Sequence, residues 1–207
     1  MLDIHSQVPW RPRAGARTTG AKLALKPVYV WGIRIRLQVA LRARDLALFD
    51  LALDSKLRGC DLVALKVSDL VSASGVRSRV MILQRKTGRP VQFEVTEQTR
   101  RSVAGWIERK GLGPGDWLFP SRKKQGAHLS TRQYARLVDR WITLIDLDPS
   151  AYGTHSMRRT KVSLLYKKTG NLRACQLLLG HTKLESTVRY LGVEVDDALE
   201  LSEALEL

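Results

Sequence analysis

The stretch that decides the fold runs from residue 154 to residue 190 and reads THSMRRTKVSLLYKKTGNLRACQLLLGHTKLESTVRY. Its first part predicts a helix over residues 155–168. Thr154 is a suitable N-cap, because its hydroxyl can accept a hydrogen bond from the first turn. The helix would end in cations followed by Gly170, which is the usual chemistry of a helix C-terminus. The C-terminal third of the chain is therefore expected to be helical.

The second part of this stretch predicts two further short helices. Asn171 can cap a helix over residues 172–179, and Gly180 ends it. The pattern Thr182-Lys-Leu-Glu185 resembles a capping box, which would open the next helix. Tyr190 lies in that last helix, close to its expected end at Gly192.

Upstream of this stretch, the spacing of apolar residues predicts helices and then a small sheet. The helical stretches are about 28–41, 45–57, 59–65, 97–110 and 130–145, the last with Ser130 or Thr131 as its cap. The strand-like stretches are 66–71, 80–84 and 90–95, and Arg85-Lys86-Thr87-Gly88-Arg89 suits a hairpin turn between the last two. We expect a mainly α fold with a small three-stranded antiparallel β-sheet.

Three segments of different character follow from composition. Residues 1–26 mix proline, glycine and cations without periodicity, which indicates a flexible basic arm. Residues 27–192 have the patterning of one folded domain. Residues 193–207 are acidic, and residues 195–205 place a narrow apolar stripe on one helical face. This last segment is expected to be a docking helix on a protein surface.

Charge is the first functional signal. The 207 residues contain 35 Lys and Arg against 20 Asp and Glu, a net charge of +15. Six of the carboxylates, and no cation, lie in residues 193–207, so residues 1–192 carry +21. This balance predicts a polyanion, and therefore nucleic acid, as the partner. A basic ribosome-associated protein, or a merely soluble one, would show the same charge.

Other classes of protein find little support in the sequence. It holds no uninterrupted apolar run of about 18 residues, and residues 1–20 are polar where a signal peptide needs an apolar core. We therefore expect a cytoplasmic protein with no membrane partner, associated with the nucleoid when bound to DNA. Neither a Cys and His spacing typical of metal sites nor a glycine-rich phosphate loop occurs, so no metal and no cofactor are expected.

A set of six residues carries the chemistry, although each alone has an ordinary explanation as a surface cation, a structural histidine or a buried aromatic. They are, in chain order, Arg58, Lys86, His155, Arg158, His181 and Tyr190. Together they supply cations for phosphate oxygens, a base, an acid and an aryl-oxide nucleophile, which is enough to cleave a phosphodiester without a metal. His155 and Arg158 also share one face at a helix N-terminus, a natural anion site.

The motifs around these residues resemble those of the tyrosine recombinase (phage-type integrase) family. The resemblance rests on Thr154-His-Ser-Met-Arg-Arg-Thr160, on Leu177-Leu-Leu-Gly-His-Thr182 and on Ser186-Thr-Val-Arg-Tyr190, and it covers about residues 28–207. It implies the family's catalytic domain, mainly helical with a small sheet. The family commonly places a separate helical DNA-binding domain before this one. Here only the basic arm is expected before the domain, so the sequence most resembles the small recombinases that invert promoter segments in bacteria, or a compact integrase of a mobile element.

The resemblance also implies a role for each residue. Tyr190 would attack a scissile phosphate and leave a 3′-phosphotyrosyl link, with His155 as the candidate base. Arg58, Arg158 and His181 would stabilise the transition state. Lys86 would protonate the leaving 5′-oxygen, and Arg89 or Lys66 could substitute for it. No ATP is needed, because the bond energy is kept in the phosphotyrosyl link.

The expected partner is double-stranded DNA, bound by a homotetramer on paired sites, with accessory DNA-bending proteins in addition. The outcome would be integration, excision or inversion of DNA. Two alternatives share the residues. A type IB topoisomerase would use the same tyrosine chemistry to relax DNA, and a regulator of the same fold would bind DNA without cutting it.

Overall fold

The computed structural model describes residues 22–191. Most of the expected arm, residues 1–21, and the expected docking helix in residues 193–207 lie outside the described residues. The last residues of the expected arm pack on the domain. The Leu25 side chain is 2% exposed, and its backbone N–H donates to Thr160 Oγ1 at 2.9 Å. The N–H of Leu23 donates to the Ala151 carbonyl at 3.0 Å, so residues 23 and 25 both contact the folded part of the chain.

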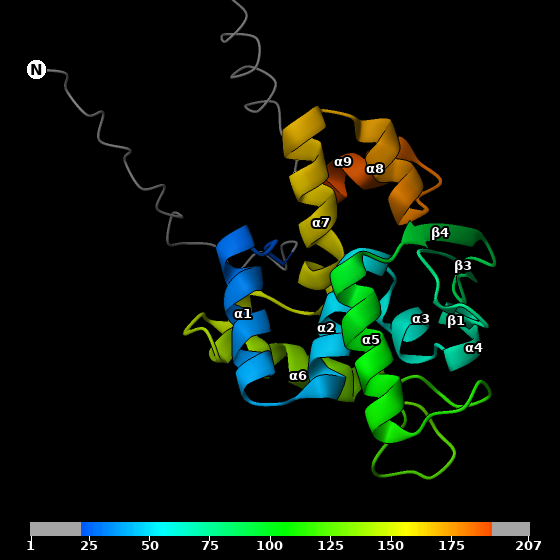
Figure 1. The fold of residues 1–207 in the computed structure, drawn as a ribbon. Coiled ribbons are helices and arrows are strands. Elements are labelled where there is room, and N and C mark those ends of the chain that lie inside the picture. The colour runs from blue at the N-terminus through cyan, green and yellow to red at the C-terminus, as the bar shows by residue number, and fades with distance from the viewer. Residues whose placement is uncertain (1–21, 192–207) are drawn as a thin grey trace, which may run out of the picture.

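Helices make up most of the described chain, as the sequence predicts (Figure 1). They are α1 (Pro27–Val39), α2 (Ala43–Ser55), α3 (Gly59–Val63), α4 (Val67–Leu70), α5 (Glu97–Lys110), α6 (Thr131–Thr143), α7 (Thr154–Thr169), α8 (Leu172–Leu179) and α9 (Leu184–Leu191), with a 3₁₀ turn at Pro149–Ala151. Ser130 and Asn171 cap α6 and α8 through their side-chain oxygens. The predicted cap Thr154 is wrong, because α7 already includes Thr154 and its N-cap is Gly153.

The strands form two antiparallel pairs in place of the single three-stranded sheet expected. Strand β1 (Val71–Ser72) pairs with β2 (Gly75–Val76), and β3 (Arg79–Leu83) pairs with β4 (Pro90–Glu94). The strand predicted over residues 66–71 is wrong, because most of it is α4. The reason is local: the Asp69 carboxylate accepts from the Lys66 N–H at 2.8 Å, which closes a helical turn.

The main core surrounds α2, which packs against α1, α5 and α7. Ten of its thirteen residues are buried, so it is covered on nearly all sides. In this core, Trp141 of α6 meets Phe49 of α2 edge-on, with ring centroids 5.4 Å apart. This core fixes the end of α2, and with it the turn that leads to Arg58.

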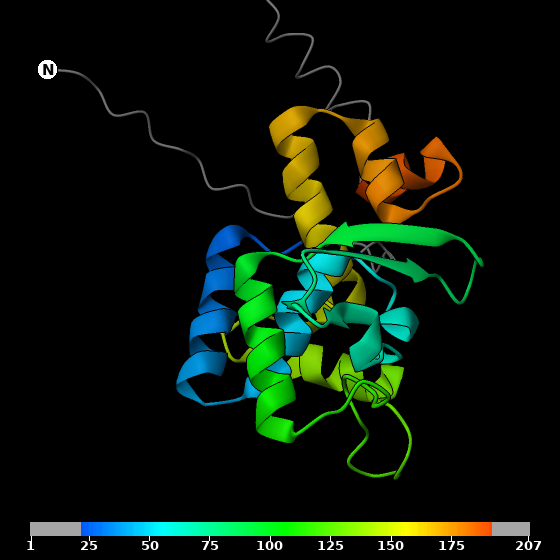
Figure 2. The same ribbon diagram turned by 45° about the vertical axis from the view of Figure 1, so that its right-hand side comes forward.

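A second, much smaller cluster holds the C-terminal helices. Its buried members are Val162, Cys175 and Leu179, with Leu165, Tyr166, Tyr190 and Leu191 packed around them. Figures 1 and 2 show α8 and α9 above the β3–β4 hairpin, on the opposite side of the domain from α6. At the end of α8, Gly180 has φ +62°, and a Cβ there would lie 2.6 Å from Val91 Cγ2 of β4. Glycine is therefore required for this contact.

Among the described residues, no helix is both long enough and apolar enough to cross a membrane.

Candidate functional site

Tyr190 lies at the centre of the candidate site. Its hydroxyl donates to the backbone carbonyl of His155 at 3.3 Å. The His181 ring meets the phenol ring edge-on, with centroids 5.4 Å apart. The guanidinium carbons of Arg158 and Arg159 lie 5.9 Å and 5.1 Å from the phenol centroid. Residues from α7, the α8–α9 turn and α9 thus enclose one phenol.

The environment of Tyr190 acts on its acidity in two directions. Burial raises the pKa of the phenol to about 12, while the charges of Arg158, Arg159 and Arg58 act to lower it. Burial is the larger effect, so the hydroxyl is protonated at neutral pH. The nearby cations would stabilise the phenolate once a base removes the proton.

The two arginines of α7 are held by backbone carbonyls. Arg158 is 4% exposed and donates through Nη2 to the Leu179 carbonyl at 2.5 Å. Arg159 donates to the carbonyl of Lys22 at 2.7 Å and to that of Tyr190. The Nε–H of each arginine finds no hydrogen-bond partner among the described residues. Each guanidinium has five N–H donors, more than these carbonyls occupy, and the remaining Nη donors could bind an anion.

Both histidines of the site favour the neutral form. Burial, followed by the charges of Arg158, Arg159 and Arg58, lowers the pKa of His155. Burial and the charges of Arg158 and Arg58 lower the pKa of His181 to about 4. Its Nδ1 lies 3.1 Å from Thr187 Oγ1. Uncharged at neutral pH, the imidazoles can accept a proton.

Arg58 approaches this cluster from the N-terminus of α3, and Lys86 does not reach it. The Arg58 guanidinium donates to Gln84 Oε1 on the hairpin, and its charge acts on Tyr190 and on both histidines. Lys86 is exposed in the turn between β3 and β4, and within residues 22–191 its side chain makes no hydrogen bond or ion pair. The structure thus brings five of the six predicted residues close together and leaves Lys86 outside this cluster.

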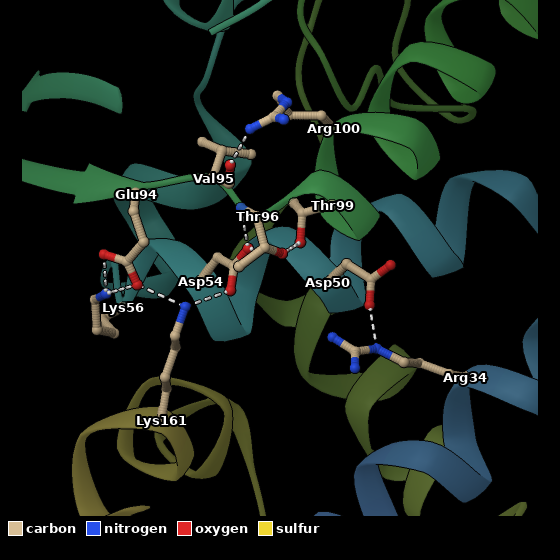
Figure 3. A network of polar contacts seen from close by, with 10 residues as sticks. All are labelled: Arg34, Asp50, Asp54, Lys56, Glu94, Val95, Thr96, Thr99, Arg100 and Lys161. Carbon is tan, nitrogen blue, oxygen red and sulfur yellow. Dashed lines mark hydrogen bonds and ion pairs between the residues drawn. The ribbon is translucent and has the colours of Figure 1, made fainter. Parts of the chain in front are cut away.

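A partly buried network of charges joins α7, which carries His155 and Arg158, to α2 and β4 (Figure 3). Lys161 of α7 lies 2.7 Å from Asp54 Oδ1 and 2.5 Å from Glu94 Oε1. Lys56 donates to both oxygens of Glu94 at 3.0 Å and is 2% exposed. Asp54 also accepts from the N–H and hydroxyl of Thr96. Helix α2, strand β4 and helix α7 are thereby fixed to one another.

Sequence reasoning missed Arg159, Gln84 and Lys161. Arg159 stands beside Arg158 in the motif, which is the signal that could have found it. The other two show no local signal, because their partners lie far away in sequence: 26 residues separate Gln84 from Arg58, and 107 separate Lys161 from Asp54. In the part of the chain that the structure describes, no group of three or more His, Cys, Asp or Glu residues could hold a metal.

Comparison with known proteins gives a consistent result. The model of the phage integrase family matches residues 34–196. The tyrosine recombinase XerC of Erythrobacter litoralis is 29% identical over 154 residues, which are 74% of this chain and 48% of that protein. The probable integrase/recombinase YoeC of Bacillus subtilis is 24% identical and matches over 74% of this chain and 80% of its own length. This chain spans about half the length of its XerC and XerD relatives.

Solved structures of similar fold include two recombinases. The crystal structure of XerA recombinase superposes with a TM-score of 0.72 at 17% identity, covering 90% of this chain and 66% of XerA. XerH site-specific recombinase in its pre-cleavage complex with difH gives 0.68 at 21% identity, covering 89% of this chain and 55% of XerH. At these identities the likeness establishes the fold.

Proposed function

Because this chain belongs to the phage integrase family, we propose that it is a site-specific DNA recombinase, which cuts and rejoins DNA strands through Tyr190 without metal or ATP. One observation carries the proposal. The phenol of a single tyrosine lies beside the guanidinium groups of Arg158 and Arg159 and the His181 ring. Its hydroxyl donates to the His155 backbone carbonyl, and the charge of Arg58 also acts on it. Such a set suits attack on a phosphodiester, where negative charge builds on the phosphate oxygens.

The cleavage step balances with these groups together with Lys86, which protonates the leaving 5′-oxygen. Tyr190 Oη attacks the phosphorus, the bond from phosphorus to the 5′-oxygen breaks, and a 3′-phosphotyrosyl link remains. The phenol proton passes to the neutral imidazole of His155, which is the base. A 5′-hydroxyl from the partner strand then attacks the phosphotyrosyl link, which reverses the chemistry and frees Tyr190.

Arg58 and Arg158 stabilise the transition state by binding the non-bridging phosphate oxygens. Each guanidinium presents a planar set of donors suited to phosphate. His181 donates a further hydrogen bond to the same oxygens. Its low pKa in the DNA-free protein means that this donor is the N–H of a neutral ring, unless the bound phosphate draws a second proton.

Lys86 supplies the proton that the leaving 5′-oxygen needs. An alkoxide is a poor leaving group, so an acid within reach speeds its departure. Its place in an exposed turn suits an acid that contacts the reacting atoms once DNA is bound.

The partners in this proposal are double-stranded DNA and further copies of the chain. A homotetramer on paired sites, with accessory DNA-bending proteins, would exchange the strands. Residues 1–26 would add phosphate contacts, and the acidic residues 193–207 would dock on a neighbouring subunit. Sedimentation on paired sites of a chain shortened after Gly192 tests that docking: loss of tetramers supports it, and normal tetramers exclude it.

The experiment that tests the function traps the covalent intermediate. Nicked duplexes that tile the DNA on both sides of the gene are incubated with the protein in EDTA. We expect a protein–DNA adduct at a defined position, with the 3′-phosphate on the peptide that contains Tyr190. Supercoil relaxation without site preference would indicate a topoisomerase. Site-specific binding with no adduct would indicate a regulator.

A further inference from the structure

Gln84 is a buried amide between the Arg58 guanidinium and the turn that carries Lys86. It directly follows β3 and is 1% exposed. Its Oε1 accepts from Arg58 Nη1 and also from the Thr87 hydroxyl at 2.9 Å. The backbone of Gln84 closes the same turn, since its carbonyl accepts from the Gly88 N–H at 2.8 Å. One side-chain oxygen thus joins α3 to the tip of the hairpin.

The orientation of this amide follows from its partner. With oxygen and nitrogen exchanged, the amide NH₂ would face the guanidinium, and two donors cannot share a hydrogen bond. Nε2 therefore points the other way, toward Gly180, where it lies 3.1 Å from the position of an added Cβ. It has no hydrogen-bond partner among the described residues. Gln84 thus touches the segments that carry Arg58, Lys86 and His181.

The main chain on either side of Lys86 is anchored, while its exposed side chain makes no hydrogen bond or ion pair with the described residues. Before it, the N–H of Arg85 donates to Asp61 Oδ1 at 2.9 Å. After it, the Gly88 N–H donates to the Gln84 carbonyl, and the Thr87 hydroxyl donates to Gln84 Oε1. Asp61 belongs to α3, and Gln84 accepts a hydrogen bond from Arg58, the residue just before that helix. Both anchors therefore attach the turn to the start of α3. These contacts fix the position of the turn relative to Arg58.

We propose that Gln84 is a positioning residue, which sets Arg58 and the Lys86 turn in register for cleavage. The inference rests on the proposed function and deepens it. A buried donor with no partner is unfavourable for folding, so packing stability alone does not favour an amide at this place. Its oxygen, by contrast, fixes two groups that must meet the same phosphate. A displacement of about 1 Å at a reacting group can slow a reaction on the order of 100-fold.

Two substrates separate the two groups that Gln84 holds. After the cleavage position has been mapped with wild-type protein, a duplex is made with sulfur in place of the bridging 5′-oxygen there. A thiolate leaves without protonation, so this substrate does not need the acid Lys86. It still needs Arg58, because the non-bridging oxygens are unchanged.

Gln84→Met removes the acceptor at nearly constant volume. We expect single-turnover cleavage of ordinary DNA to slow by about 100-fold, and the loss on the sulfur substrate to shrink to about 10-fold, which is the part due to Arg58. Gln92→Met makes the same chemical change on the same hairpin at an exposed position, so its rates should stay within about 3-fold of wild type on both substrates.

Thr87 gives a second test that does not disturb the core, because it is exposed in the turn. Thr87→Val should slow cleavage of ordinary DNA by about 10-fold and be rescued almost fully by sulfur, since only the turn is released. Thr87→Ser keeps the hydroxyl and should restore the rate.

Each outcome supports or overturns either the proposed function or the positioning role of Gln84. If wild type forms no adduct, the proposed function fails. If wild type cleaves and Gln84→Met matches Gln92→Met, or loses the same factor on both substrates, the positioning role is overturned. If Gln84→Met does not fold, a Thr87→Val rate equal to that of Thr87→Ser overturns it instead.

Discussion

Removing the Leu179 side chain should release the C-terminal helices while the main core stays folded. Leu179 is fully buried, and it is one of three buried residues that hold α8 and α9 to the end of α7. Leucine-to-alanine changes at such sites cost about 2.7–5 kcal/mol, depending on how far the cavity collapses. Since about 1.4 kcal/mol is a factor of ten, local opening of α8 and α9 should rise by roughly 100-fold to 3,000-fold in Leu179→Ala.

Hydrogen exchange followed by mass spectrometry measures this opening segment by segment. Peptides from α8 and α9 should exchange faster by that factor, while peptides from α2 keep the wild-type rate. DNA cleavage should fall as well, because α9 carries Tyr190. Leu177→Ala is the matched control, since it makes the same change on the same helix at a side chain that is 62% exposed.

Two results would refute this reasoning. If the amides of α2 accelerate by the same factor as those of α8, the two clusters unfold as one unit. If no segment accelerates, the small cluster does not hold the helices.

Three further predictions concern charge. His181 has a folded pKa of about 4 against about 6.5 unfolded, so its contribution to stability is complete above about pH 6.5 and is lost as the pH falls toward 4. As the pH falls from about 6.5 toward 4, the melting temperature of His181→Gln should therefore fall less than that of wild type. Lys161→Met leaves Asp54 and Glu94 without their shared cation (Figure 3), which should lower the free energy of unfolding by about 2–3 kcal/mol in denaturant titrations, since the side chain is one-third exposed. Glu97→Gln, which breaks two exposed pairs, is the control for Lys161→Met and should leave the denaturant midpoint nearly unchanged. Deleting residues 1–21, which hold three arginines, should make the log–log salt dependence of DNA binding shallower by up to about 3; an unchanged slope would leave those residues without phosphate contacts.

Local chemistry in the sequence accounts for much of the fold. Gly111, Gly170 and Gly180 follow helical patterns, and all three adopt the left-handed conformation that ends α5, α7 and α8. Ser130 and Asn171 act as caps because their side chains reach the next turn. Such signals depend on neighbours a few residues away, so they can be read without the tertiary structure.

Features that depend on distant contacts could not be predicted in this way. The short helix at Val67–Leu70 has strand-like residues. Besides the local contact of Asp69 with Lys66, a bridge from Lys66 to Trp117, far away in sequence, holds this segment. Lys56 takes the left-handed conformation at φ +54°, and its ammonium is held by Glu94, which is 38 residues away.

The same distinction between local signals and distant contacts applies to the candidate site. Helix periodicity places His155 and Arg158 on one face of α7, and the motifs identify the other predicted residues, but only the tertiary structure shows that Gln84 contacts Arg58.

The role of Tyr190 as nucleophile is tested by comparing adduct formation by wild type, Tyr190→Phe and Tyr166→Phe on the same nicked duplex. Tyr166 packs in the same cluster as Tyr190 and serves as the matched control. We expect a covalent protein–DNA band for wild type and for Tyr166→Phe, and none for Tyr190→Phe. The Tyr190→Phe protein should still bind the duplex, because only one hydroxyl is lost. A covalent adduct formed by Tyr190→Phe would contradict this role of Tyr190.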